Sequence, residues 1–583
     1  AAISPVATHT FIFVDGTRDP GRDGVVGQSV FQSPIKNHEV YGPLMNDGLQ
    51  ALPAISIIKS GGVSSSETET SIELISNDGS ERGFQVDCGI KLVGGASVGS
   101  PKNNFRCYFR SQYGEPKLRY PLFANHPYSG GGSEVFDVIQ LRSASHDNFY
   151  WMGRLAHPPS PFRDADALYI RNRFTWDVEM LMGHTSIHGR WAHCYLNGVY
   201  HGLYQIHERP MHHYLDKYLG GDPEDYHYTN SGRTGSDHGG GDSWNNAWNE
   251  VRTAAGAPGE VSKDWISWES LADNQLLYFY FGNDWDWSSR HNWMAAGPKN
   301  AGEGGWRFYS WDCDVSMYDV NENNLGRNTP DGVFPTIMNN EEFRVYFRDR
   351  VFKHCFHDGV LRANGLRPAF DYRIDELWNA IVPETARWQP SNTHSAPWDR
   401  DGEWQVEIDY MRDTFFPGRT TVLLDQLRDR GWYPVEAPEF TPRGGPVNAG
   451  FSPLIDSPSG GTIYLTMDGS DPRLPGGAVN PGAEAFNGSS TTTTVIPRDA
   501  NWKYLDDGTD QGLAWRTTTY PDENWAEGPA ELGYGDNDEQ TQVSWGSDAG
   551  AKQITTYFRR QFDVRDDAEV SAILMEMKRD DGA

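Results

Sequence analysis

The first half of the chain carries apolar and polar residues in the pattern of β-strands. Short runs rich in β-branched and aromatic residues are separated by Gly, Asn and Ser, which predicts strands joined by tight turns. The runs begin near Leu52 and are PAISIIKS, TSIELIS, FQVDCGIKLVGG, NNFRCYFRS, FDVIQLRS, RWAHCYLNG and VYHGLYQIHE. Asn197-Gly198 lies between the last two runs and is the strongest short-range signal for a hairpin.

Helical periodicity interrupts these strands once and then replaces them. FRDADALYIRNRFTWDVEMLMG has apolar residues at helical spacing and ends in glycine. From about residue 264 the same spacing recurs in WISWESLADNQLLYFYFG, NNEEFRVYFRDRVFKHCFHDGVL, FDYRIDELWNAIVPETARW and FFPGRTTVLLDQLRDRGW. A strand-rich half followed by a helix-rich half predicts an α+β fold with two lobes.

Changes in composition divide the chain into four segments. Residues 1–50 predict a loop-rich extension, in which DGTRDPGRDGVVG is a candidate for a structural calcium ion. The two-lobed domain spans 51–435. Short strands and Gly/Pro turns over 436–497 predict a small β-sandwich. Residues 498–583 are again strand-like and stop in mid-pattern, so we expect the native chain to continue beyond Ala583.

Charge and cysteine usage exclude several classes of protein. The chain has 50 basic and 80 acidic residues, a net charge of −30, and so acidic a surface repels nucleic acid and anionic lipid. No apolar run approaches the ~18 residues of a membrane span, and the opening AAISPVATHT shows no signal peptide. The five cysteines lack CxxC spacing, which favours free buried thiols. They are Cys88, Cys107, Cys194, Cys313 and Cys355.

Two pairs of aspartates set among tryptophans are the main chemical signal. GNDWDWSSRHNW carries Asp284 and Asp286, and WRFYSWDCDV carries Asp312 and Asp314. Carboxylates are costly to bury among aromatic rings unless they are paired or bind a cation. Side chains alternate along extended backbone, so we expect Asp312 and Asp314 to face opposite sides, one binding metal and the other accepting backbone hydrogen bonds.

The order of these motifs matches the layout of protein kinases. In that layout a catalytic loop carries an Asp and then an Asn, and a hairpin leads to an Asp that holds magnesium. Here Asp286 and Asn292 precede the strand–turn–strand pattern NWMAAGPKNAGEGGWRFYSW, which leads to Asp312 and Asp314. One carboxylate would orient the attacking hydroxyl, while the Asn and a second carboxylate would hold metals that bridge the phosphates.

An upstream lysine would complete this layout. Lys102 stands at the entry of the predicted strand 103–109, where it could neutralise phosphate charge. Lys117, in GEPKLRYPLF, is the alternative.

Other motifs are weaker indications of a functional site. The Gly-rich RTGSDHGGGDS at 233–243 lacks the GxxxxGK[ST] pattern and predicts a plain loop. His207, His212 and His213 near Glu208 lack HExxH spacing, so a solvated helix start is favoured over a zinc site. No GxSxG motif occurs.

The chain resembles the CotH family, the spore-coat-protein kinases with an atypical kinase fold. The resemblance rests on GIKLVGGASVGSPKNNFRCYFRSQYGEPKLRYPLF, FDVIQLRSASHDN, YLNGVYHGLYQIHERP, NDWDWSSRHNW and WRFYSWDCDVSM, in the family's order over roughly 52–432. It implies ATP, Mg or Mn, phosphoryl transfer to Ser or Thr of a protein substrate, and an extracellular or cell-envelope location.

The resemblance also implies a role for each matching residue. Lys102 would meet the ATP phosphates, Glu208 would lie near the nucleotide, and Asp312 with Asp314 would hold the metal.

The catalytic loop matches the family's pattern less closely. Asp286 with Asn292 matches its Asp and Asn, with Asn292 serving both nucleotide and metal. Their interval is one residue longer than usual, so Asp284 remains a rival base, and Ser288 stands where the family has proline.

The C-terminal segments have resemblances of their own. IYLTMDGSDPR is similar to the small β-sandwich at the C-termini of chitobiases and hexosaminidases, and the region from WKYLDDGTDQGLAW to RQFDV is similar to the start of a galactose-binding-like jelly roll. This combination resembles large bacterial surface proteins and makes surface glycan an alternative partner. Because fold resemblance does not establish activity, a catalytically silent surface or adhesion protein stays open, as does a glycan-binding or glycan-processing protein.

Overall fold

The structure is a computed structural model in which the chain separates into two compact units. The first contains residues 1–436 and 466–483, and the second contains residues 437–465 and 484–583. The structure describes residues 8–12, 30–125, 127–128, 131–152, 167–231, 241–254, 263–282, 291–301, 304–327, 329–388, 398–446, 451, 454–486, 495–535, 539–548 and 550–562.

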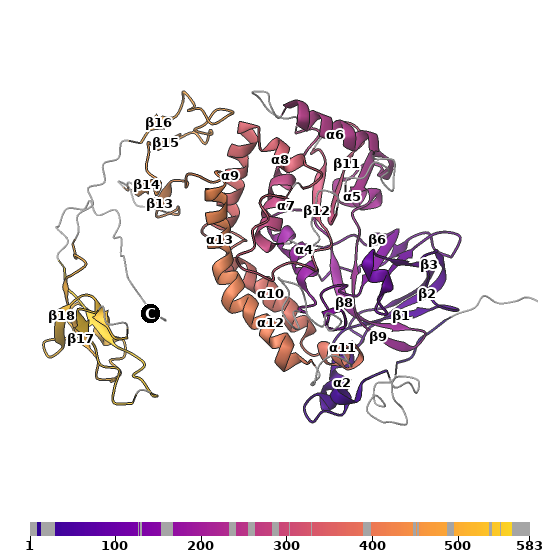
Figure 1. Cartoon of the computed structure of the whole chain (residues 1–583), viewed down its shortest axis with the longest axis horizontal. Helices are drawn as coiled ribbons and strands as arrows, with labels where there is room; N and C mark the ends of the chain where they lie inside the picture. Colours follow the sequence, from indigo (N-terminus) through magenta and orange to yellow (C-terminus); the bar gives the residue numbers. More distant parts are fainter. Residues whose placement is uncertain are drawn as a thin grey trace, which may run out of the picture. The chain divides into compact units, whose positions relative to one another are not determined.

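Seven strands of the first unit close into a barrel in the order β1-β2-β3-β4-β7-β9-β8 (Figure 1). The parallel pairing of β1 with β8 closes it, and the other neighbours are antiparallel. Apolar side chains from all seven strands join in one buried cluster, which fills the barrel. The strands are β1 (Ala54–Ile58), β2 (Thr68–Ile75), β3 (Phe84–Val93), β4 (Asn104–Tyr108), β7 (Val138–Arg142), β8 (Gly189–Leu196) and β9 (Val199–His207).

The β8–β9 hairpin confirms its sequence signal. Asn197 and Gly198 have φ angles of 52° and 77°, the left-handed backbone that a two-residue turn between twisted strands requires. A second short pair, β5 (Leu118–Arg119) and β6 (Val135–Phe136), lies outside the barrel sheet.

Helices form the other part of the first unit, packed around a large apolar cluster and a three-stranded sheet. The sheet contains β10 (Tyr226–Asn230), β11 (Trp293–Pro298) and β12 (Arg307–Ser310). The longer helices are α4 (Arg171–Leu181), α6 (Gly241–Ala254), α7 (Trp268–Phe281), α9 (Glu341–Cys355), α10 (Ala363–Leu377) and α13 (Phe416–Asp429). The shorter helices are α3 (Phe149–Met152), α5 (His212–Leu219), α8 (Val333–Ile337), α11 (Ile381–Trp388) and α12 (Gln405–Tyr410). The mixed α+β class is therefore confirmed.

Helix α7 shows how local sequence sets a boundary next to the expected catalytic loop. The Ser267 side chain accepts a hydrogen bond from the Ser270 N–H, which caps the first turn. Gly282 ends the helix at φ 63°, a left-handed C-cap that glycine adopts without strain. The chain is therefore turned out of the helix just before residues 283–290.

Two N-terminal helices were not predicted. They are α1 (Ser33–Lys36) and α2 (Tyr41–Gln50), and they pack with the start of β1 and with α11 in a cluster of their own. The candidate calcium loop DGTRDPGRDGVVG lies outside the described residues.

The second unit contains only short strands and one three-residue helix among its described residues. Its sheets are β13 (Glu439–Thr441) with β14 (Leu454–Asp456), β15 (Tyr464–Leu465) with β16 (Glu484–Ala485), β17 (Asn501–Leu505) between β18 (Ala526–Pro529) and β21 (Tyr557–Arg559), and β19 (Leu532–Gly533) with β20 (Thr541–Gln542). The β-sandwich and jelly roll of the sequence analysis stay predictions.

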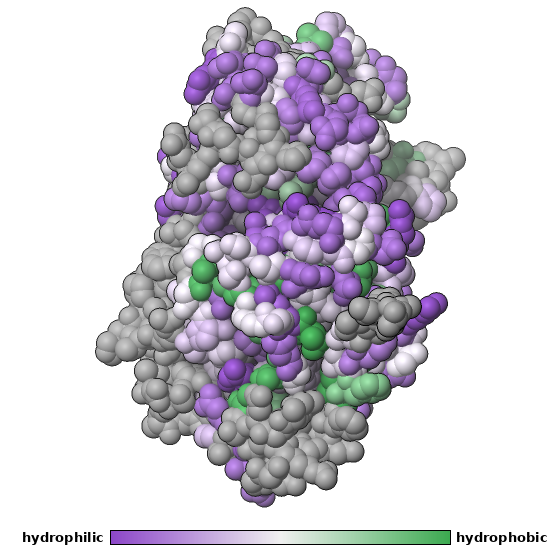
Figure 2. All heavy atoms as spheres, turned by 90° about the vertical axis from the view of Figure 1, so that its right-hand side faces the viewer, coloured by the Kyte–Doolittle hydropathy of each residue, from purple (hydrophilic) through white to green (hydrophobic). Residues whose placement is uncertain are grey.

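The cysteines and the surface of the first unit can be compared with the predictions from cysteine spacing and hydropathy. All five cysteines are free and buried, as expected. No helix in the described part of the chain is long and apolar enough to cross a membrane. On the barrel side, hydrophilic residues cover most of the upper part, and apolar side chains gather in the lower part (Figure 2).

Candidate functional site

Lys102 forms a buried ion pair at one end of the barrel. Its Nζ lies 2.6 Å from Oε1 of Glu384, and both side chains are fully excluded from solvent. Oε2 of Glu384 accepts a hydrogen bond from the Leu203 N–H at 2.7 Å. The rings of Tyr169 and Tyr204 lie 5.5 and 5.6 Å from Nζ. Burial lowers the pKa of Lys102, and the Glu384 carboxylate opposes that shift.

A glycine makes room for this pair. Gly202 on β9 has φ 116°, and a Cβ there would lie 2.5 Å from Oε2 of Glu384 and 3.0 Å from Cε of Lys102. A side chain at this position would therefore displace one of the two charged groups. Because each charge is costly to bury alone, the pair depends on close fit as well as on charge.

Glu384 was missed by the sequence analysis. It lies within the amphipathic stretch IVPETARW, where nothing local separates it from a surface glutamate. Its partner is 282 positions away along the chain, so only the tertiary fold identifies it. The alternative lysine, Lys117, contacts Asp137 and keeps 29% of its side chain exposed, so Lys102 is the one in a closed site.

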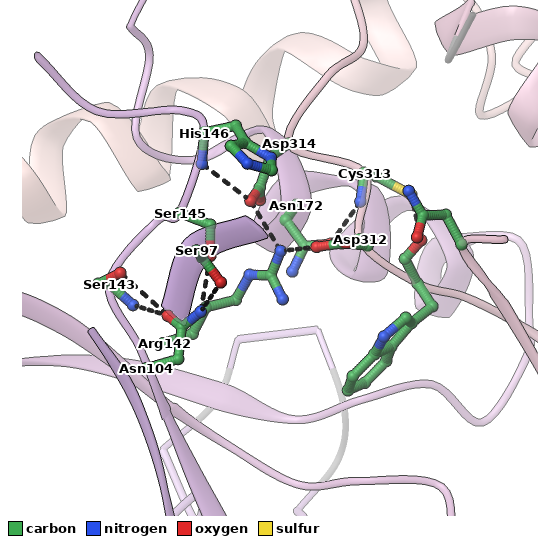
Figure 3. A network of polar contacts seen from close by, with 12 residues as sticks. Ser97, Asn104, Arg142, Ser143, Ser145, His146, Asn172, Asp312, Cys313 and Asp314 are labelled. Carbon is green, nitrogen blue, oxygen red and sulfur yellow. Dashed lines mark hydrogen bonds and ion pairs between the residues drawn. The ribbon is translucent and has the colours of Figure 1, made fainter. Parts of the chain in front are cut away.

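Asp312 and Asp314 both face the guanidinium group of Arg142. Nη2 of Arg142 lies 2.7 Å from Oδ2 of Asp314 and is also in close contact with Oδ1 of Asp312 (Figure 3). The prediction that the two carboxylates face opposite sides is therefore wrong. Strand β12 ends at Ser310, and Asp312 has φ 58°, so side-chain alternation no longer applies.

Hydrogen bonds hold the turn that carries the two aspartates. The Cys313 N–H donates to Oδ1 of Asn172 at 2.9 Å, and the Ser316 hydroxyl donates to the Cys313 carbonyl at 2.8 Å. Asn172 belongs to α4, so the turn is fixed to the helical part of the unit. These contacts position both carboxylates before any ligand arrives.

The electrostatics of this group are unbalanced. Two carboxylates share one guanidinium, and Oδ1 of Asp314 is buried without a hydrogen-bond partner among the described residues. Burial raises the pKa of Asp314. Burial also acts to raise the pKa of Asp312, but the charges of Arg142 and His146 and the Arg142 hydrogen bond together outweigh it, so that pKa is lowered. An unsatisfied buried carboxylate oxygen is costly and marks where a further positive group would be stabilised.

The lysine and the aspartates are joined by one loop. Phe105 of β4 pairs with Leu141 of β7, so Lys102 and Arg142 lie at the same end of the barrel. Oδ1 of Asn104 accepts bonds from the N–H and hydroxyl of Ser143 at 2.8 and 2.9 Å.

A second pair of bonds extends this connection to Asp314. Nδ2 of Asn104 donates to the Ser145 hydroxyl at 2.8 Å (Figure 3). The next residue, His146, donates its N–H to Oδ2 of Asp314 at 3.4 Å. The loop after β7 thus connects the two halves of the site.

The same loop contains a further buried acid that sequence reasoning missed. Asp147 accepts hydrogen bonds from the N–H groups of Leu168 and Arg171 at 2.8 and 3.0 Å, and it contacts the Arg171 guanidinium. Burial nevertheless raises the pKa of Asp147 to about 7, with the Asp314 charge adding to the shift. The motif SASHDN, which contains Asp147, was the sequence signal that could have identified it.

Asn292 lies at the aspartate end of the β11–β12 hairpin. Trp293 pairs with Ser310, which places Asn292 beside the exit of β12. Tyr278 donates its hydroxyl proton to the Asn292 carbonyl at 2.7 Å and accepts from the Trp311 N–H at 2.9 Å. Nδ2 of Asn292 is buried without a partner among the described residues. Its φ of 62° shows that the backbone is held in an uncommon conformation here.

The predicted catalytic loop lies outside the described residues. Asp284 and Asp286 lie at 283–290, outside the described residues, as do Trp285, Trp287 and Ser288. The described residues on either side are Gly282, which ends α7, and His291, which comes two residues before β11.

Glu208 has partners of its own. It lies 2.6 Å from Nδ1 of His188 and accepts from the Tyr218 hydroxyl at 2.6 Å, while Lys102 is paired with Glu384. Glu208 lines a surface hollow shared with Asp137. The resemblance placed it near the nucleotide, and the structure does not bring it into contact with Lys102.

The histidines near Glu208 lie at the end of β9 and at the start of α5. His212 begins α5, which confirms the helix start, but its side chain is buried, so the prediction of a solvated start is wrong for this residue. In the described part of the chain, no group of three or more His, Cys, Asp or Glu side chains is arranged to hold a metal ion. Most of the Gly-rich 233–243 lies outside that part.

The aspartate group suits a hard divalent cation better than a soft one. Its donors are the carboxylates of Asp312 and Asp314, with the Asn292 amide at the same end of the hairpin. Mg²⁺ and Mn²⁺ prefer oxygen ligands, usually one or two carboxylates completed by water and phosphate. The orphaned Oδ1 of Asp314 is the atom that fits such an ion.

Comparison with known proteins identifies one family model that matches part of the chain. No curated protein matches the chain. Residues 160–422 match the family model described as CotH kinase protein. The matched segment includes Asn292, Asp312, Asp314 and Glu384, and Lys102 precedes it. The chain therefore contains a CotH kinase-like region.

Proposed function

We propose that this chain is an exported or surface-located kinase that transfers a phosphoryl group from ATP to Ser or Thr of a protein substrate, with Mg²⁺ or Mn²⁺. The observation that carries the proposal is the connection of a buried lysine–glutamate pair to an unbalanced aspartate pair through one loop. A lysine suits the phosphates, and the aspartates suit the metal that accompanies them.

Each part of the site would have a separate task. Lys102, oriented by Glu384, would neutralise phosphate charge. Asp314 and Asp312, with Asn292, would hold the divalent ion, which supplies charge neutralisation for the phosphoryl group when bound. Asp286, or its rival Asp284, would accept the proton of the attacking hydroxyl.

One observation favours a silent relative of such kinases. The Arg142 guanidinium already contacts both carboxylates, and a side chain in that position can replace a metal as their counter-charge. A surface or adhesion protein that kept the fold without the reaction would retain such a contact. The glycan-contacting role of the C-terminal segments belongs to this alternative.

Binding and transfer assays distinguish the two. We expect ATP with Mn²⁺ to raise the melting temperature of the protein, and labelled ATP to phosphorylate an acidic protein substrate. Asp286→Ala should retain the melting shift while losing transfer by about 10²–10⁴-fold. No shift and no transfer with Mg²⁺, Mn²⁺ or Ca²⁺ would leave the silent protein as the better description.

A further inference from the structure

Helix α11, which carries Glu384, is held between two different surfaces. Its Glu384 face meets β9 and Lys102, and its Trp388 indole N–H donates to the His201 carbonyl at 2.8 Å. Val382 and Ala386 lie two residues to either side of Glu384, so they project from the opposite face of the helix.

That opposite face is covered by the N-terminal helices. Val382 and Ala386 are buried in a cluster with apolar residues of this segment: Phe31, Ile35, Tyr41, Met45 and Leu49. The Gln32 N–H donates to the Ala386 carbonyl at 2.6 Å. The Tyr41 hydroxyl donates to Oδ1 of Asp399, beyond the C-terminal end of α11, at 2.8 Å.

The closest approach is made by a glycine. A Cβ on Gly48 of α2 would lie 2.6 Å from the Asn379 carbonyl and 2.6 Å from Cδ of Pro383, the residue before Glu384. The Gly48 carbonyl is also 2.8 Å from Nε2 of His193, so α2 has little freedom to withdraw. Any side chain at position 48 must push α11, and the backbone next to Glu384, toward Lys102 or along the helix axis.

We propose that residues 30–50 are a positioning element for the phosphate-binding lysine: they fix α11 from behind and so hold Glu384 against Lys102. The proposal rests on the proposed function of this site. The segment lies outside the matched range 160–422, so the CotH kinase-like region of this chain depends on residues that the family match does not include. Loss or displacement of the segment would weaken nucleotide binding without changing any residue that touches the nucleotide.

Lys102 itself provides a readout that does not depend on activity. If Glu384 is displaced, the buried Lys102 loses the carboxylate that opposes the effect of burial on its pKa. More of the lysine is then neutral and nucleophilic at neutral pH. Because Lys102 is excluded from solvent, the reagent reaches it only when the ion pair opens, and displacement of Glu384 makes that opening easier. The rate at which an amine-reactive ester modifies Lys102, measured by mass spectrometry relative to Lys117, therefore reports the position of Glu384.

Two matched glycine substitutions test the proposal in the full chain. Gly48→Ala should raise the labelling rate of Lys102 above that of the unmutated protein and should weaken ATP–Mn²⁺ binding. Gly359→Ala is the control, because a Cβ there would lie 2.4 Å from the His354 carbonyl, in a turn after α9. It should lower the melting temperature with no change in Lys102 labelling.

The outcomes separate this inference from the proposed function. If both substitutions raise labelling equally, or if neither does, the segment is not a specific positioning element. If Gly48→Ala raises labelling but the unmutated protein binds no ATP, the positioning holds and the kinase assignment fails. Should Gly48→Ala not fold, Tyr41→Phe removes only the hydroxyl bonded to Asp399 and should give a smaller rise in labelling; unchanged labelling in this variant would contradict the proposal.

Discussion

The two halves of the site differ in how completely their charges are satisfied. Lys102 and Glu384 form a neutral pair, fully buried, with one glutamate oxygen on the lysine and the other on a backbone N–H. Asp312 and Asp314 share a single arginine, and Oδ1 of Asp314 has no hydrogen-bond partner among the described residues. The charges of Lys102 and Glu384 balance without a ligand. The two aspartates and Arg142 together lack one positive charge for neutrality.

This difference in charge balance indicates that the aspartate half is the one that would bind a positively charged ligand. A balanced buried pair contributes a fixed geometry, because breaking it exposes an uncompensated charge. An unbalanced acidic pair is strained by its own repulsion and is relieved by a cation. Substitution of the lysine half should therefore change stability most, and substitution of the aspartate half should change metal binding most.

The largest expected effect is on stability, from Lys102→Met. The change leaves Glu384 buried without its partner and should lower the free energy of unfolding by about 3–5 kcal/mol. Urea denaturation measures this. Lys117→Met is the matched control, because its partly exposed pair with Asp137 should be worth about 1 kcal/mol or less.

A double substitution sharpens that result. Lys102→Met with Glu384→Met removes both charges and should recover most of the lost stability while nucleotide binding stays lost. If the double variant is as unstable as Lys102→Met alone, the ion pair is not the cause.

The second effect is on metal binding, from Asp314→Asn. The amide keeps the shape of the side chain but removes the charge, and metal affinity should fall by about 100-fold or more, since even outer-shell partners are worth 10–100-fold. Calorimetric titration with Mn²⁺ measures it. Asp137→Asn, which changes an acid away from the site, should leave Mn²⁺ binding unchanged; equal losses in the two variants would remove Asp314 as a ligand.

The third effect is a loss of folding stability at acidic pH, caused by the buried His193. Burial lowers the pKa of His193 to about 4, from an ordinary value of 6.5. Between these values the unfolded chain binds a proton that the folded chain does not, so stability is complete above pH 6.5 and falls as the pH decreases toward 4. The loss between pH 6.5 and 5 should be on the order of 2 kcal/mol. His193→Gln should flatten this part of the stability–pH curve, and an unchanged slope would show that other groups cause it.

The smallest expected effect comes from Arg142→Met. Removing the positive charge beside the aspartates should strengthen Mn²⁺ binding by about tenfold, because the metal no longer faces a neighbouring cation. The melting temperature without metal should fall, and the rise on adding Mn²⁺ should exceed that of the unmutated protein. A smaller rise would mean that Arg142 helps to form the metal site.

The sequence allowed prediction of those parts of this arrangement that depend on local patterns. The hairpin at Asn197-Gly198, helix α7 with its Gly282 cap, and the β11–β12 hairpin that leads to Asp312 all follow from spacing and turn residues. Lys102 and the two aspartates were identified from motif order. In the structure, the loop after β7 connects the segment that carries Lys102 to the turn that carries the aspartates.

What could not be predicted depends on contacts between distant segments. Glu384 is 282 positions from Lys102, and Arg142 is 172 positions from Asp314. The prediction for Asp312 and Asp314 failed because it assumed extended backbone beyond the end of β12. Helix α2 lies in a Gly-, Asp- and Pro-rich segment that predicts a loop, and its role arises from a close approach at Gly48.

The most direct test of the central claim is a crystal structure with a non-hydrolysable ATP analogue and Mn²⁺, in which anomalous scattering locates the metal. We expect Mn²⁺ on Oδ1 of Asp314, with a phosphate oxygen of the analogue completing its shell and another within hydrogen-bond distance of Nζ of Lys102. Arg142 should then have moved away from at least one aspartate. Crystals grown with saturating analogue and Mn²⁺ that show neither bound here, with Arg142 still joining both aspartates, would contradict the assignment of this site to ATP.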